Sequence, residues 1–195
     1  NIGDKDVIYI GATTSRDVPK IMAIASQGSS LYIYEISPEM IQGKKGTICS
    51  GYWELTPETG LVEGKLPVAT SAYFDRMFYY AVGNKIYRAD LTRSTPRSYE
   101  IYAHPDPSVR ITRLKFRSQR EDRWDISGGD EVEAIPYDFV SYLGGVAEYP
   151  DGNCSMLEMK LTAAGEIDKE EGTKDLMVYE FKGFKNVVDF VYAFK

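Results

Sequence analysis

Four aromatic residues are the side chains of this sequence best suited to hold a ligand. They are Trp53, Trp124, Tyr52 and Tyr142. Exposed aromatic rings offer a large contact area at a small entropic cost, and sugars present apolar C–H faces to such rings. Tyr52 adjoins Trp53, and Tyr142 stands near a pair of glycines, so the tyrosines could extend a tryptophan platform. The four residues predict a carbohydrate-binding surface, and burial of both tryptophans in a core is the alternative.

Residues suited to catalysis or metal binding are sparse. His104 is the only histidine, too few for a multi-histidine zinc site or a well-supported nucleophile triad, and its proline-rich surroundings predict a loop. Phosphate loops, nucleophile elbows and dinucleotide fingerprints are missing, and residues 125–131 lack the full spacing of a calcium loop. We therefore predict no catalytic residues, no metal and no cofactor. A pair of carboxylates in a glycoside hydrolase or lyase is the less favoured alternative.

The charge pattern narrows the class of partner. A net charge of −6 argues against nucleic acid, because neutralising phosphates needs a basic surface. The one basic cluster spans residues 110–123, where Arg113, Lys115 and Arg117 share one face of a predicted strand. We expect that face to be solvated or salt-bridged, with a groove for an acidic ligand as the alternative. Residues 166–175 predict a solvated acidic loop.

Two further observations concern cysteines and membranes. Cys49 and Cys154 are too few for a disulfide framework, and we predict two free thiols, with one long-range disulfide as the alternative. No apolar run approaches the roughly 18 residues that a membrane-spanning helix needs.

The elements that must position these side chains are short β-strands. Helix signals are nearly absent, and the one candidate covers residues 38–42. Apolar and aromatic runs broken by turn residues predict strands at 7–12, 20–26, 30–37, 48–54, 69–74, 77–82, 85–91, 98–103, 111–117, 131–137, 145–149, 155–162, 176–181 and 187–194. So many short strands predict an all-β sandwich, barrel or propeller.

Three hairpins point to the propeller among these. They turn at residues 27–30, 83–84 and 151–153, and their second strands resemble copies of one unit at irregular offsets. The strands at 31–36 and 77–82 are apolar on both faces, which predicts a sheet covered on both sides without helices. We predict a β-propeller-like domain of about four blades of short antiparallel strands, covering residues 1–195 as one domain or as the C-terminal part of a larger propeller.

The stretch from Tyr79 to Arg88 resembles a blade hairpin of the PKD-like family lipoproteins of Bacteroidetes, and residues 111–116 and 187–192 fit the same pattern. Members of that family combine a lipid-anchored leader, immunoglobulin-like PKD modules and a C-terminal propeller-like region. The resemblance implies an exported protein at the cell surface or outer membrane, often found beside glycan-uptake machinery. Contact with the membrane would run only through a lipid anchor that is absent from this chain. The family supplies no catalytic residues.

These observations together predict a non-enzymatic, exported or cell-surface binding or scaffold protein. Its expected partner is a polysaccharide or a protein of a surface transport complex. A protein–protein interaction module is the alternative, and a propeller-type glycoside hydrolase or lyase ranks third.

Overall fold

The computed structural model describes residues 3–13, 20–36, 49, 51–55, 68–72, 77–121, 124–125, 133–134 and 138–192. Over these residues the chain contains strands and no helix, which confirms the all-β prediction. The strands are β1 (Asp6–Thr13), β2 (Lys20–Gln27), β3 (Ser30–Ile36), β4 (Gly51–Leu55), β5 (Val68–Ala72), β6 (Met77–Val82), β7 (Lys85–Asp90), β8 (Ser98–Ala103), β9 (Arg110–Glu121), β10 (Trp124–Asp125), β11 (Glu133–Ala134), β12 (Asp138–Glu148), β13 (Asn153–Leu161) and β14 (Val178–Lys185). The helix expected at 38–42 lies outside the described residues.

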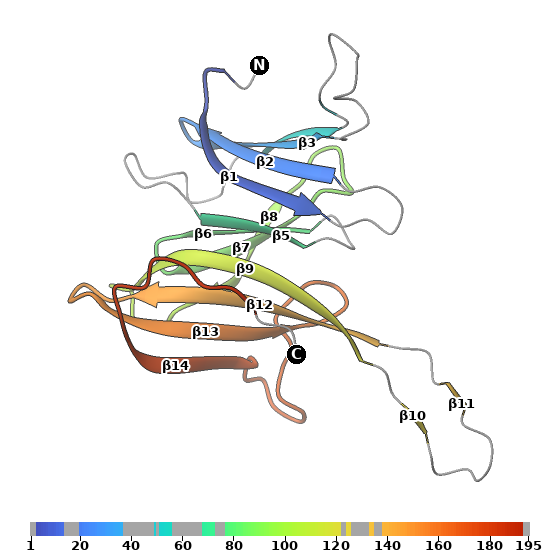
Figure 1. Ribbon diagram of the computed structural model, residues 1–195, viewed down its shortest axis with the longest axis vertical. Helices are drawn as coiled ribbons and strands as arrows, with labels where there is room; N and C mark the ends of the chain where they lie inside the picture. Colours follow the sequence, from blue (N-terminus) through green and yellow to red (C-terminus); the bar gives the residue numbers. More distant parts are fainter. Residues whose placement is uncertain are drawn as a thin grey trace.

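The strands form three four-stranded antiparallel sheets that follow one another along the chain (Figure 1). Sheet 1 has the order β1-β2-β3-β4, sheet 2 the order β5-β6-β7-β8, and sheet 3 the order β9-β12-β13-β14. The short pair β10-β11 is inserted between β9 and β12. The three predicted hairpin turns are confirmed, and each contains a glycine with positive φ: Gly28 at 58°, Gly83 at 60° and Gly152 at 81°.

The three sheets stack in chain order and enclose two hydrophobic cores (Figure 1). The first core lies between sheets 1 and 2, and the second between sheets 2 and 3. Successive residues of a strand point to opposite faces. Accordingly Phe78 and Tyr80 of β6 enter the first core, while Tyr79 and Ala81 enter the second. The expectation that this strand is covered on both faces is confirmed.

The sheets approach one another most closely along the edge formed by their first strands. β1 contacts β5, and β9 contacts both β5 and β6. The last strands of sheets 1 and 2, β4 and β8, have no comparably extensive contact with a neighbouring sheet in the described part of the chain. Each sheet therefore has an inner edge, made by its first strand, and an outer edge made by its last.

The strand boundaries differ from the prediction mainly in sheet 3. β9 and β12 run beyond the expected 111–117 and 145–149 because they continue as a paired ribbon towards β10-β11 (Figure 1). Within the expected strand 131–137, the structure describes residues 133–134, and both pair with β10. The strand expected at 187–194 is wrong over residues 187–192, which belong to no strand. β14 ends at Lys185 because Asn186 adopts a left-handed conformation, with φ of 51°.

Cys49 and Cys154 are both free thiols, as predicted. Cys154 is buried on β13, whereas Cys49 packs beside the outer face of sheet 1. No helix that could span a membrane occurs among the described residues.

Candidate ligand-binding cleft

The four aromatic residues predicted to form a platform come from three different sheets. Trp53, on β4, is partly buried and packs against the first core. Its neighbour Tyr52 points to the opposite, outer face of sheet 1 and is 51% exposed. Trp124 lies on β10 of the two-stranded ribbon, and Tyr142 lies on β12 of sheet 3. The structure therefore does not bring the four residues together into one platform.

Tyr52 belongs to a group of tyrosines on the outer face of sheet 1. Its ring stacks on Tyr32 with centroids 6.2 Å apart, and it is tilted against Tyr34 at 5.3 Å. The ammonium group of Lys5 lies 4.5 Å from the Tyr32 ring. In this outer tyrosine face Tyr52 is the exposed ring, since Tyr34 is buried and Tyr32 is partly buried.

Tyr142 belongs instead to a surface that residues 187–192 cover. The Arg117 guanidinium lies 4.5 Å from the Tyr142 ring and 4.9 Å from the Tyr192 ring. Lys115 forms an ion pair of 3.1 Å with Asp189, and Arg117 one of 3.3 Å with Glu158. The C-terminal segment crosses sheet 3 (Figure 1), where a Cβ on Gly144 would overlap the Tyr192 hydroxyl. The expected salt-bridged basic face is confirmed, and its cations are engaged by the protein itself.

A cleft of about 450 Å³ opens between the outer part of sheet 2 and the connection 162–177. This volume lies within the range of about 300–1,000 Å³ typical of ligand sites. One wall comes from β7, β8 and the loop between them, including Arg88, Arg97 and Tyr99. The other wall comes from Glu166, Lys169 and their neighbours in the connection. The sequence analysis did not identify this cleft.

Two long-range hydrogen bonds fix the second wall against sheet 2. The Tyr79 hydroxyl donates a hydrogen bond of 2.8 Å to the carbonyl oxygen of Gly165. Gly165 has φ of 77°, and a Cβ there would lie 2.7 Å from that hydroxyl, so the turn requires glycine. The Arg88 guanidinium donates to the carbonyl oxygen of Ala164. The position of the connection therefore depends on side chains of β6 and β7.

Arg88 and Tyr99 lie next to each other in the first wall of the cleft. The Arg88 side chain is only 12% exposed, and its guanidinium lies 3.7 Å from the Glu166 carboxylate and 5.9 Å from the Tyr99 ring. Tyr99 itself is 48% exposed. A half-exposed ring beside a fixed guanidinium can stack on a ligand while offering it a positive charge.

The acids that line the cleft are each paired with a cation. Asp90 lies 3.7 Å from Arg93, and Glu100 lies 2.7 Å from Lys85. Hydrogen bonds from Thr92, together with the Arg93 and Arg88 charges, hold the pKa of Asp90 below its ordinary value despite partial burial. Among the described residues, no cluster of three or more His, Cys, Asp or Glu side chains is placed to hold a metal ion. Each of the three carboxylates in the cleft lining is thus compensated by a cation.

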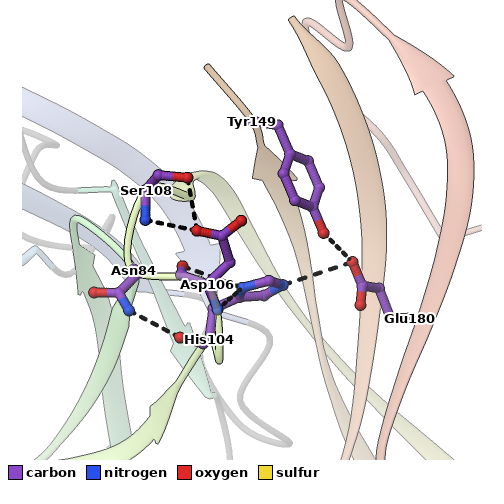
Figure 2. Close-up of polar contacts among 6 residues, drawn as sticks. All are labelled: Asn84, His104, Asp106, Ser108, Tyr149 and Glu180. Carbon is purple, nitrogen blue, oxygen red and sulfur yellow. Dashed lines mark hydrogen bonds and ion pairs between the residues drawn. The ribbon is translucent and has the colours of Figure 1, made fainter. Parts of the chain in front are cut away.

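His104 lies in a second polar cluster, between sheets 2 and 3, and follows β8 in the loop that the sequence predicts (Figure 2). It is 5% exposed, and Asn84 holds its backbone through bonds of 2.9 Å in both directions. The Asp106 amide donates to His104 Nδ1 at 3.1 Å, so this ring nitrogen acts as an acceptor. Nε2 faces Glu180 Oε1 at 3.6 Å, and the Tyr149 hydroxyl donates to the same oxygen at 2.8 Å.

The pKa values in this cluster follow from its burial. Burial and the negative charge of Glu180 raise the pKa of Tyr102 to about 12. Burial also raises the pKa of Glu180, but the Ser155 and Tyr149 hydroxyls and the charge of Lys182 outweigh it and lower the pKa overall. The cluster joins sheet 2 to sheet 3 through partners within the protein, which is a structural role.

We expect Glu180→Gln to make the protein less stable at neutral pH but not in acid. A carboxyl group whose pKa is lowered by folding stabilises the protein above its ordinary value of 4.5, and this is lost as the pH falls through the lowered pKa. The variant should lose about 1–2 kcal/mol of unfolding free energy at pH 7, and the difference should vanish at low pH. Urea unfolding between pH 3 and 7 measures this.

Glu148→Gln is the matched control. Glu148 pairs with Arg110 at 3.0 Å in an exposed ion pair, so its loss should cost less than about 0.5 kcal/mol at any pH. A loss in Glu180→Gln that is the same at pH 3 and pH 7 would contradict the charged role assigned to Glu180.

Comparison of the chain with protein-family models, with curated proteins and with solved structures finds no match. The cleft and its charges are therefore the features from which a function can be inferred.

Proposed function

We propose that this protein is a non-enzymatic binding protein built from β-propeller-type blades, and that its cleft between Tyr99 and Lys169 holds a glycan. The observation that carries the proposal is the half-exposed Tyr99 ring beside the fixed Arg88 guanidinium in a cleft of about 450 Å³. Carbohydrate sites combine an aromatic ring for the C–H face of a sugar with polar groups for its hydroxyls. We place the protein at the cell surface, as the resemblance to PKD-like lipoproteins implies, with a polysaccharide or a transport-complex protein as partner.

The proposal of propeller blades rests on how the sheets are built and stacked. Each sheet has four antiparallel strands, successive sheets pack face to face, and the first strands lie closest together. These features are typical of neighbouring blades around a central axis. Closed rings contain about four to eight blades. The described residues form three such sheets, so we propose blades of a larger ring rather than a ring closed by these residues alone.

Binding is favoured over glycoside hydrolysis by the state of the cleft carboxylates. A glycosidase needs a carboxylic acid whose pKa is raised so that it can protonate the leaving group. Asp90 has a lowered pKa, and Glu100 and Glu166 are each paired with a cation. A protein–protein interaction module is the second candidate, favoured by the outer tyrosine face of Tyr32, Tyr34 and Tyr52.

Calorimetric titration with a panel of neutral and acidic polysaccharides tests the proposal. We expect saturable binding that Tyr99→Ala weakens about tenfold, because the ring contributes on the order of 1 kcal/mol or more through stacking. Tyr52→Ala is the matched control, since Tyr52 is similarly exposed, at 51%, but lies on sheet 1. The Tyr52→Ala variant should bind the polysaccharide with the affinity of the unaltered protein.

Other outcomes would contradict this assignment. Absence of binding to every polysaccharide removes the glycan role and leaves the interaction module as the better candidate. Loss of binding in Tyr52→Ala with normal binding in Tyr99→Ala moves the ligand to the outer tyrosine face. Loss of binding in Trp124→Ala alone would place the ligand on the two-stranded ribbon, where the sequence analysis proposed Trp124 as a binding residue.

A further inference from the structure

The cleft carries more positive charge than its own acids neutralise. Its charged lining side chains are Arg88, Arg93, Arg97 and Lys169, and Asp90, Glu100 and Glu166. Asp90 pairs with Arg93, Glu166 pairs with Arg88, and Glu100 pairs with Lys85, which does not line the cleft. Arg97 and Lys169 have no ion pair within the described part of the chain. The cleft thus has two uncompensated cations.

These two cations come from opposite walls. Arg97 directly precedes β8, and Lys169 belongs to the connection 162–177. An anionic group between the walls would interact with both, and a guanidinium matches the geometry of carboxylate and sulfate oxygens. Arg88 adds little further attraction, because its side chain is only 12% exposed and its guanidinium is paired with Glu166.

The excess of positive charge is a local property of the cleft. The whole chain has a net charge of −6, so it repels polyanions in general. The other basic surface, formed by Lys115 and Arg117 on sheet 3, is occupied by Asp189, Glu158 and two tyrosine rings. An acidic ligand in the cleft would thus meet two cations that form no ion pair with a described carboxylate.

We infer that the ligand of this cleft is an acidic glycan, whose sugar ring stacks on Tyr99 and whose carboxylate or sulfate lies between Arg97 and Lys169. The inference rests on the proposed function, because it names the ligand class of the same site. A neutral sugar would use Tyr99 alone and would leave both cations without a partner.

A dextran series tests this with one backbone in three charge states: neutral dextran, carboxymethyl-dextran and dextran sulfate. Polygalacturonate and its methyl ester provide a second matched pair with a different backbone. Calorimetry near 0.15 M salt should show at least tenfold tighter binding of an acidic polymer than of its neutral counterpart. The carboxymethyl and sulfate arms identify which anion is preferred.

Variants then test which cations of the protein bind the acidic group of the ligand. Arg97→Gln and Lys169→Gln should each weaken acidic binding about three- to tenfold, and the double variant more, by the usual strength of partly exposed charge contacts. Tyr99→Ala should weaken neutral and acidic polymers alike. The charge-matched control is Arg110→Gln with Lys182→Gln, which removes two cations that do not line the cleft. It should leave the preference for acidic polymers unchanged.

The outcomes separate the two claims. Equal binding of acidic and neutral polymers overturns the acidic class but leaves the glycan-binding function standing. Acidic binding that the Arg97 and Lys169 double variant retains, or that the control pair loses equally, overturns the placement in the cleft. Failure of every polymer to bind overturns both claims.

Discussion

Replacing Tyr80 with alanine is expected to lower the free energy of unfolding by about 3–5 kcal/mol, the usual cost of removing a buried aromatic ring. Tyr80 is fully buried at the centre of the first core. Its ring stacks on Phe78 and Tyr87, with centroids 5.7 Å and 5.2 Å apart. Its hydroxyl donates a 2.7 Å hydrogen bond to Ser98 Oγ. Small domains have only about 5–15 kcal/mol of stability, so the loss is severe.

Chemical denaturation followed by circular dichroism measures this effect. Tyr80→Phe is the matched variant, because it keeps the ring and removes only the hydrogen bond. It should cost about 1–2 kcal/mol, since the buried Ser98 hydroxyl loses its partner. A loss below 1 kcal/mol in Tyr80→Ala would show that sheets 1 and 2 do not pack as described.

The second large effect is expected for Leu143→Ala in the other core. Leu143 is fully buried on β12, in register with Phe116 of β9 and Met159 of β13. Its truncation leaves a cavity between sheets 2 and 3, and the expected loss is about 2–5 kcal/mol. Leu143→Met conserves volume and should cost less than about 1.5 kcal/mol.

The two truncations together test whether the sheets unfold as one unit. Sheet 2 contributes to both cores, so a truncation in either core should shift one common unfolding transition to a lower denaturant concentration. Hydrogen exchange of the sheet 1 and sheet 3 amides should therefore accelerate together in each variant. Separate transitions, with Leu143→Ala affecting only sheet 3, would contradict this coupling.

The fold could be anticipated largely because β6 and β7 carry unambiguous local signals. Residues 77–82 are apolar on both faces, and Gly83-Asn84 supplies a tight turn, so both the hairpin and its double burial follow from the sequence. The strand predicted over residues 187–192 is wrong, because these residues are as apolar as a strand but do not pair with one. Val188 and Val191 remain 76% and 79% exposed, while Phe190 and Tyr192 lie against Gly144. The sequence alone does not show that Gly144 leaves room on sheet 3 for these two rings, because that room exists only once the strands of the sheet are paired.

The site could be anticipated much less. Arg88 and Glu166 are far apart in the sequence, and they meet only because Tyr79 and Arg88 bind the backbone at residues 164–165. No local sequence pattern predicts such long-range hydrogen bonds. One part of the prediction could have been corrected from the sequence. Tyr52 and Trp53 are adjacent on one strand, so their side chains face opposite sides of the sheet and cannot share a platform. Applied to β4, that rule separates the exposed tyrosine from the core tryptophan.

The segment over sheet 3 also bears on self-association. A stack of sheets can in principle be extended at both ends, since sheet 1 of one copy could lie on sheet 3 of the next and so on without limit. Asp189, Phe190 and Tyr192 already occupy the sheet 3 end through Lys115, Arg117 and Gly144. A second copy or a further blade that lies on this face of sheet 3 would therefore have to displace these residues or pack against them.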